Sequence, residues 1–142
     1  MSRVAAIRPE GTGAPLARRR SLLQISDNPA RRADYMVRLD GAIEAGAAGT
    51  VAIALAYIPD RAILSPAGFG AYLDSLKGEN WGSIEELGAA ILADIESEVV
   101  PRYLRLTLRG GTDKPGCVSG HVVLFEGRQP DWKNDAILAR LG

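Results

Sequence analysis

The only cysteine and the only histidine of the chain are Cys117 and His121, whose side chains suit nucleophilic attack and proton transfer. The segment Cys117–Phe125 has the composition of a strand, and a spacing of four places both side chains on one face. Four residues of strand separate them by about 13 Å, too far for direct proton transfer within one strand. Two hypotheses follow: a Cys/His pair completed between subunits, or a buried small thiol beside a histidine without a chemical role.

Arg109-Gly110-Gly111 is a second candidate site, because a guanidinium and the backbone N–H groups of a glycine turn can hold an anion. The same three residues also suit a simple turn between a strand and a loop. A metal site is not expected, since one cysteine and one histidine fall short of the three or four ligands that zinc normally takes.

Four strands and three helices are expected to position these residues. The alternating and apolar segments predict strands at Ala33–Leu39, Thr50–Ile58, Arg102–Arg109 and Cys117–Phe125. Ser65-Pro66 and the capping box from Ser83 to Glu86 start two helices, and Pro130–Leu141 is expected to form a third. An Ala- and Gly-rich loop should fill residues 40–49. The acids Asp94, Glu96 and Glu98 are expected on a solvated helix face.

Composition indicates one domain spanning residues 21–142, preceded by a flexible basic arm at residues 1–20. Residues 1–39 carry eight arginines against three acids, which could contact phosphates or an acidic partner. The formal charge of the chain is zero, so nucleic-acid binding is not expected. No apolar run reaches the roughly 20 residues that span a bilayer, and no signal-peptide pattern opens the chain. With its single cysteine, the protein is expected in the cytoplasm, without membrane contact.

Short motifs in a fixed order carry a resemblance to a known family. They are Asn28-Pro29, Tyr35, Tyr57-Ile58-Pro59-Asp60, Tyr72-Leu73, Glu85, Pro101-Arg102-Tyr103 and Arg109-Gly110-Gly111. In this order, over roughly residues 28–111, the chain resembles the NADPH-dependent 7-cyano-7-deazaguanine nitrile reductases (the QueF family) of queuosine biosynthesis. The resemblance implies a tunnelling fold (T-fold), in which subunits join antiparallel sheets into barrels and bind purine- or pterin-like rings at their interfaces.

The chain departs from that family at the positions that the resemblance assigns to chemistry. The nucleophilic cysteine falls on Ala42, the proton-donating aspartate on Gly49, and the histidine of a His-Glu pair on Ile84. Reduction of a nitrile through a thioimide requires a thiolate, which alanine does not provide. The resemblance therefore implies the fold and the ring pocket, with the nitrile reductase reaction lost.

The cofactor expected from the resemblance is NADPH, but the matching segment does not support it. The family's helix-opening signature falls on residues 65–72, SPAGFGAY, which contain no lysine to meet a 2′-phosphate. The cofactor therefore stays unassigned.

Glu85 is the residue of the family's pair that the chain retains. The capping box gives Glu86 a structural role and leaves Glu85 without one. A carboxylate can accept two parallel hydrogen bonds from the N–H and amino edge of a guanine-like or pterin-like ring. The simpler interpretation is a solvated acid favoured by the helix dipole.

We therefore expect an α+β T-fold subunit of order β-β-α-α-β-β, with a four-stranded antiparallel sheet, two helices on one face and an extra C-terminal helix. Its open edges predict a homo-oligomer. The leading hypothesis is a heterocycle-binding relative of the nitrile reductases, with ligand contacts from Glu85, Arg109 and Gly110. The alternatives are a non-catalytic partner subunit, and an NADPH-dependent nitrile reductase in which Cys117 is a relocated nucleophile.

Overall fold

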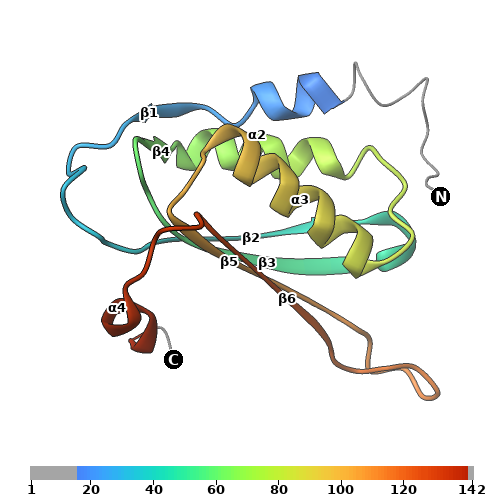
Figure 1. Cartoon of the computed structure of the whole chain (residues 1–142). Coiled ribbons are helices and arrows are strands. Elements are labelled where there is room, and N and C mark those ends of the chain that lie inside the picture. The colour runs from blue at the N-terminus through green and yellow to red at the C-terminus, as the bar shows by residue number, and fades with distance from the viewer. Residues whose placement is uncertain (1–15, 141–142) are drawn as a thin grey trace.

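The computed structural model describes residues 16–140, and these form an α+β domain built on a four-stranded antiparallel sheet of order β2-β3-β5-β6. The strands are β2 (Val37–Glu44), β3 (Thr50–Ile58), β5 (Tyr103–Gly110) and β6 (His121–Arg128). Helices α2 (Pro66–Leu76) and α3 (Ile84–Glu98) lie together on one face of this sheet (Figure 1). For the strands of this sheet and these two helices, the order β-β-α-α-β-β is the one expected from the sequence, whereas the short strands β1 (Ile25–Asp27) and β4 (Ala62–Leu64) were not expected.

The first hairpin is tighter than expected, because β2 begins at Val37 and continues to Glu44, through half of the segment expected as a loop. The two strands pair from Val37–Tyr57 to Glu44–Thr50, and a one-turn 3₁₀ helix at Gly46–Ala48 closes the turn. Gly46 and Gly49 both have positive φ angles, 60° and 75°, which glycine adopts without steric cost. Cross-strand pairing thus overrides the weak strand propensity of the Ala- and Gly-rich segment.

Both helices start where their capping residues predict. Ser65 Oγ accepts a hydrogen bond from Gly68 N at 3.1 Å, and Ser83 Oγ accepts one from Glu86 N at 3.0 Å. The Glu86 carboxylate accepts a further hydrogen bond from Gly82 N at 3.0 Å. The two serine contacts satisfy backbone donors that the first turn of a helix leaves free, and the Glu86 contact holds the residue before the cap of α3.

The core lies between the helices and the sheet. Alternate residues of β3 and β5 point into it, including Ile53, Leu55 and Leu106, each at most 1% exposed. At Gly88 the helix α3 approaches β6 so closely that a Cβ atom would lie 2.4 Å from Phe125 Cε2. The alanines of β3 occupy the opposite face, as the period of two predicts.

The tyrosine- and aspartate-containing motifs form a structural network beside the sheet. Tyr35 Oη donates a hydrogen bond to Asn28 Oδ1 at 2.6 Å, and Asn28 Nδ2 donates one to Asp60 O at 2.8 Å. Arg102 Nη1 forms an ion pair with Asp34 at 3.0 Å, and its Nε lies 3.4 Å from Asp60 Oδ1. These residues hold a two-stranded ribbon, β1 (Ile25–Asp27) and β4 (Ala62–Leu64), against the domain. Many of the motifs that carry the family resemblance therefore have a structural role.

Residues 16–21 are helical and pack on the domain, so this part of the expected arm is anchored, while residues 1–15 lie outside the described residues. The anchor is Asp94, which is fully buried. Its carboxylate accepts hydrogen bonds from Arg19 Nε and Arg20 Nε, both at 2.7 Å, and from Tyr72 Oη at 2.5 Å. The expectation that Asp94 belongs to a solvated face was wrong, because its partners come from elements distant in the sequence.

The C-terminal helix is shorter than expected, with α4 spanning Asp135–Ala139. Trp132 Nε1 donates a hydrogen bond to Asp34 Oδ2 at 3.1 Å, and its ring lies 5.6 Å from that of Tyr103. This packing fixes the C-terminal segment at one end of the sheet. Within residues 16–140, no helix is long and apolar enough to cross a membrane.

Candidate functional site

Glu85 and His121 meet at one end of the sheet. Glu85 lies in the first turn of α3, and His121 is the first residue of β6. The distance from His121 Nε2 to Glu85 Oε2 is 3.2 Å, and the two side chains are 39% and 60% exposed. The pKa of Glu85 is lowered, first by a hydrogen bond from its own backbone N–H and then by the bond to His121. The site therefore presents an ionised, accessible carboxylate steadied by an imidazole.

Gly110 belongs to the same end of the sheet. It pairs with His121 in the β5–β6 ladder, and a Cβ atom at Gly110 would lie 2.4 Å from Ile84 Cδ1. Glycine thus lets the start of α3 approach β5 closely, beside Glu85. The role of Gly110 that the structure supports is packing, and no anion contact is needed to explain it.

Arg109 lies on the other face of the sheet from Glu85. Residues of β5 alternate, with Leu106 and Leu108 buried under the helices and Arg109 exposed on the open face. Arg109 instead shares a hollow with Arg38 and Arg105. Within one subunit, the structure does not bring the candidates Glu85 and Arg109 together.

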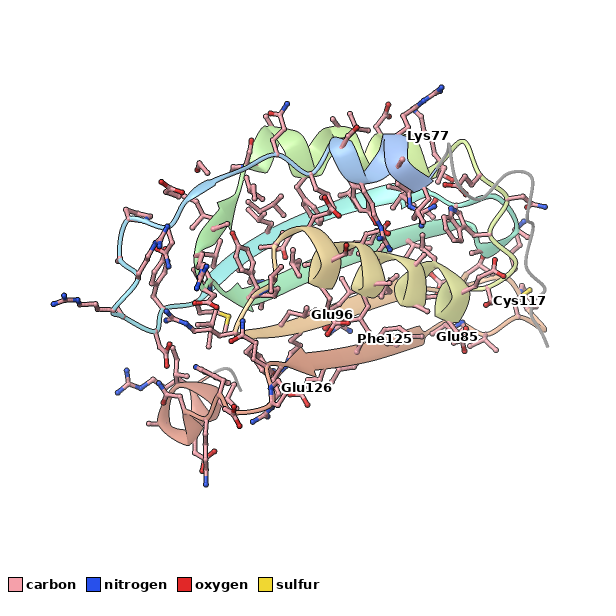
Figure 2. The ribbon with its side chains drawn as sticks, turned by 45° about the horizontal axis from the view of Figure 1, so that its top comes forward. Lys77, Glu85, Glu96, Cys117, Phe125 and Glu126 are labelled. Carbon is pink, nitrogen blue, oxygen red and sulfur yellow. The ribbon has the colours of Figure 1, made fainter. Side chains whose placement is uncertain are left out.

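Cys117 does not lie on a strand, so the expected strand Cys117–Phe125 was wrong at its first residues. β6 begins at His121, and Cys117 lies in the preceding loop, where its N–H donates a hydrogen bond to Lys114 O at 3.0 Å. Gly116, with a φ of 81°, and Gly120 flank this segment and favour a turn over a strand. The thiol is exposed, contrary to the expectation of a buried one. Figure 2 shows Cys117 at the same end of the molecule as Glu85.

A groove lies between the outer strand β2 and helix α2, and the sequence did not reveal it. Its volume is about 390 Å³, and its walls include Leu39, Gly41, Ala42, Phe69 and Leu73. The groove joins two segments that the resemblance had singled out separately, the position of the nucleophile at Ala42 and the helix-opening segment at residues 65–72. The two segments lie side by side because β2 extends past Asp40 to Glu44.

The residues of α2 do not fit the phosphates of NADPH. The one cation lining the groove is Lys77 at the far end of the helix, and its ammonium lies 2.7 Å from Asp74 Oδ1. Residues 65–72 supply only a serine that caps the helix, a proline in its first turn, glycines, alanines and buried aromatic rings. The groove therefore does not provide the charges that would hold this cofactor. Within the described range 16–140, no three His, Cys, Asp or Glu side chains gather as metal ligands would.

Comparison with known proteins supports the fold. No family model matches the chain, and no curated protein matches it. A solved structure, the crystal structure of the archaeosine synthase QueF-Like in the apo form, matches with a TM-score of 0.59 and 22% sequence identity. The match covers 69% of this chain and 98% of that chain. The chain thus shares its fold with that structure, and this fold is the T-fold that the sequence predicts.

Proposed function

We propose that the protein binds a purine- or pterin-like heterocycle between two subunits and no longer carries out nitrile reduction. The observation that carries this proposal is the exposed Glu85 carboxylate, held by His121 at the edge strand β6. The T-fold likeness and the groove on the opposite edge strand support it.

The two edge strands of the sheet suit assembly of several subunits into a closed oligomer. β2 and β6 are the outer strands, and each has eight residues. Repeating a four-stranded antiparallel sheet around an axis places β6 antiparallel to β2 of the next subunit, which removes both open edges. With all eight residues paired, His121 lies opposite Glu44 of that subunit, and Val123 opposite Ala42. Glu85 then faces the groove between β2 and α2.

The combined site has the parts that a flat heterocycle needs. The Glu85 carboxylate accepts two hydrogen bonds from the N–H and amino edge of the ring, and its exposure leaves both oxygens accessible. The groove of the neighbouring subunit supplies apolar walls from Leu39, Phe69 and Leu73. Ligand pockets commonly combine such apolar walls with a few polar groups that fix orientation.

Among the residues that the structure describes, the proposed site contains no nucleophile for nitrile reduction. Ala42 lines the groove where the resemblance places a cysteine, and Gly49, in the turn after β2, stands where it places an aspartate. Cys117 lies in the exposed loop before β6, where no base is bonded to its thiol among residues 16–140. A thioimide intermediate therefore has no positioned thiolate.

Calorimetric titration with guanine, 7-cyano-7-deazaguanine and a pterin tests the proposal. We expect at least one ring to bind, and Glu85→Gln to weaken that binding by roughly 10–100-fold, because a charge-assisted pair of hydrogen bonds is lost. Glu96→Gln on an exposed turn of the same helix is the matched control and should leave affinity unchanged. Absence of binding to every ring, or full affinity in Glu85→Gln, contradicts the proposal.

The same experiment distinguishes the two alternative functions, a non-catalytic partner subunit and a reductase that uses Cys117. A non-catalytic partner subunit would bind none of these rings and would not respond to Glu85→Gln. A reductase using Cys117 would consume NADPH in the presence of 7-cyano-7-deazaguanine, and Cys117→Ala would stop that consumption. We expect no such turnover.

A further inference from the structure

Three arginines surround a hollow on the face of the sheet opposite α2 and α3. Arg38 comes from β2, and Arg105 and Arg109 come from β5. Together they line a depression of about 230 Å³ whose remaining walls are Met36, Ala54, Ala56 and Thr107. We call it the arginine hollow. The C-terminal segment contacts the end of this face near Tyr103, through Trp132.

The strand register brings the three arginines around a floor of small residues. Ala56 of β3 pairs with Arg38 on one side and with Arg105 on the other, and Ala52 pairs with Arg109. Since neighbouring strands lie about 4.8 Å apart, the Cα atoms of Arg38 and Arg105 are separated by on the order of 10 Å. Two long side chains can close that gap around a small anion, and the alanine methyl groups leave room for it.

Local acids balance this charge only in part. Arg38 Nε lies 3.2 Å from Asp40 Oδ1, but the side chains are 69% and 61% exposed, so water screens the pair. Arg105 Nη2 is 4.0 Å from Glu126, whose carboxylate also accepts a hydrogen bond from Tyr103 Oη. The Arg109 side chain has no ion pair or hydrogen bond within residues 16–140. The hollow is therefore positive at its Arg109 side.

The Arg105 guanidinium has a buried N–H donor without a partner in the described part of the chain. Its Nε atom is buried and has no hydrogen-bond partner among the described residues. A buried guanidinium donor without an acceptor is unfavourable and rare in folded proteins, and a rotation of the Arg105 side chain toward the hollow would offer this donor to an anion oxygen.

We propose that the arginine hollow binds the phosphate group of a small molecule. A guanidinium offers parallel N–H donors that match two oxygens of a phosphate, and three of them exceed what a single carboxylate can accept. The Thr107 hydroxyl provides one more donor at the wall. The volume suits a phosphate or short phosphate chain and is far below that of a nucleic-acid strand. This inference is independent of the ring site, because Glu85 lies at the other face.

Titration calorimetry at constant ionic strength, with the full-length protein, tests the proposal. The probes are inorganic phosphate, inorganic pyrophosphate and a nucleoside triphosphate, with chloride as the background anion. We expect pyrophosphate to bind, and Arg109→Gln and Arg38→Gln each to weaken it roughly tenfold or more, since each removes a charge-assisted contact. Both positions are on exposed surface, so the sheet should remain folded, as circular dichroism would verify.

Arg32→Gln is the matched control, because it makes the same charge change at an exposed residue outside the sheet. It should leave pyrophosphate binding within about twofold, because only screened long-range attraction is altered. A triphosphate that binds more tightly than pyrophosphate, with the same loss in Arg109→Gln, identifies a nucleotide as the source of the phosphate. Absence of binding to all three probes, equal losses in Arg32→Gln, or preferential binding of a single-stranded oligonucleotide that triphosphate cannot displace would overturn the proposal.

Discussion

His121 Nε2 lies 3.2 Å from Glu85 Oε2, although the two residues are 36 positions apart and belong to a strand and a helix. The contact depends on Gly110, which pairs with His121 and lets Ile84 and the start of α3 approach β5. Glu85 was expected to contact a ligand and His121 was a candidate catalytic group. The two side chains meet within a single chain.

The first prediction concerns the ionisation of Glu85. Because its own backbone N–H is the larger cause of the lowered pKa, His121→Ala should raise the pKa of Glu85 only part of the way to its ordinary value. Carboxyl-detected NMR titration of the two proteins measures this. An unchanged Glu85 pKa in His121→Ala would show that the pair does not persist in solution.

The lowered pKa of Glu85 also determines how ring binding should depend on pH. A glutamate whose pKa is lowered in the folded protein stays ionised until the pH falls below the ordinary range, and its interactions are lost as the pH falls through the lowered value. Ring binding through Glu85 should therefore persist into mildly acidic solution. Affinity measured from neutral to acidic pH checks this, and a loss centred above the ordinary glutamate range would assign the titration to another group.

A second prediction concerns the buried anchor at Asp94. Asp94→Ala leaves Arg19, Arg20 and the Tyr72 hydroxyl without their common acceptor, so unfolding free energy should fall by about 3 kcal/mol or more. Urea denaturation measures the change, and proteolysis near residues 16–21 should become faster because their helix loses its attachment. Glu96→Gln, an exposed acid on the same helix, should stay within about 0.5 kcal/mol. Equal effects of the two substitutions would contradict the ion-pair account.

Two glycine substitutions separate packing from helix propensity. Gly88→Ala in α3 places a methyl group against Phe125 and Leu108, so it should destabilise the protein by about 1–3 kcal/mol. Gly70→Ala in α2 meets no heavy atom within 4 Å and should stabilise it by about 0.5–1 kcal/mol. Thermal and urea unfolding of both variants test the contrast. If both substitutions stabilise, α3 does not pack on β6 as closely as described.

The sequence predicted the parts of the fold that depend on local signals. Ser65-Pro66 and the box from Ser83 to Glu86 gave both helix starts, because their capping bonds join residues three positions apart. The alternation of β3 and β5 gave their buried faces. The capping box also correctly predicted a structural role for Glu86, whose carboxylate accepts a hydrogen bond from Gly82 N.

Features that depend on distant partners could not be predicted in this way. Asp94 looked like a surface acid because Arg19 and Arg20 lie more than 70 residues earlier in the chain. Residues 40–44 looked like a loop because their composition is rich in Ala and Gly, whereas β3 supplies the hydrogen bonds that make them a strand. The loop position of Cys117 does have a local signal, because glycines such as Gly116 and Gly120 weaken a strand.

The central claim is that the ring site is shared between subunits, and mixing two defective variants tests it most directly. Glu85→Gln removes the carboxylate, and Gly70→Trp fills the groove from an exposed position on α2. Each variant alone should bind the heterocycle at least about tenfold more weakly than wild-type protein does. After joint unfolding and refolding in equal amounts, about one interface in four should pair an intact Glu85 with an intact groove, and calorimetry should recover about a quarter of the sites. No recovery from mixed assemblies whose composition is verified by mass spectrometry would contradict a site shared between subunits.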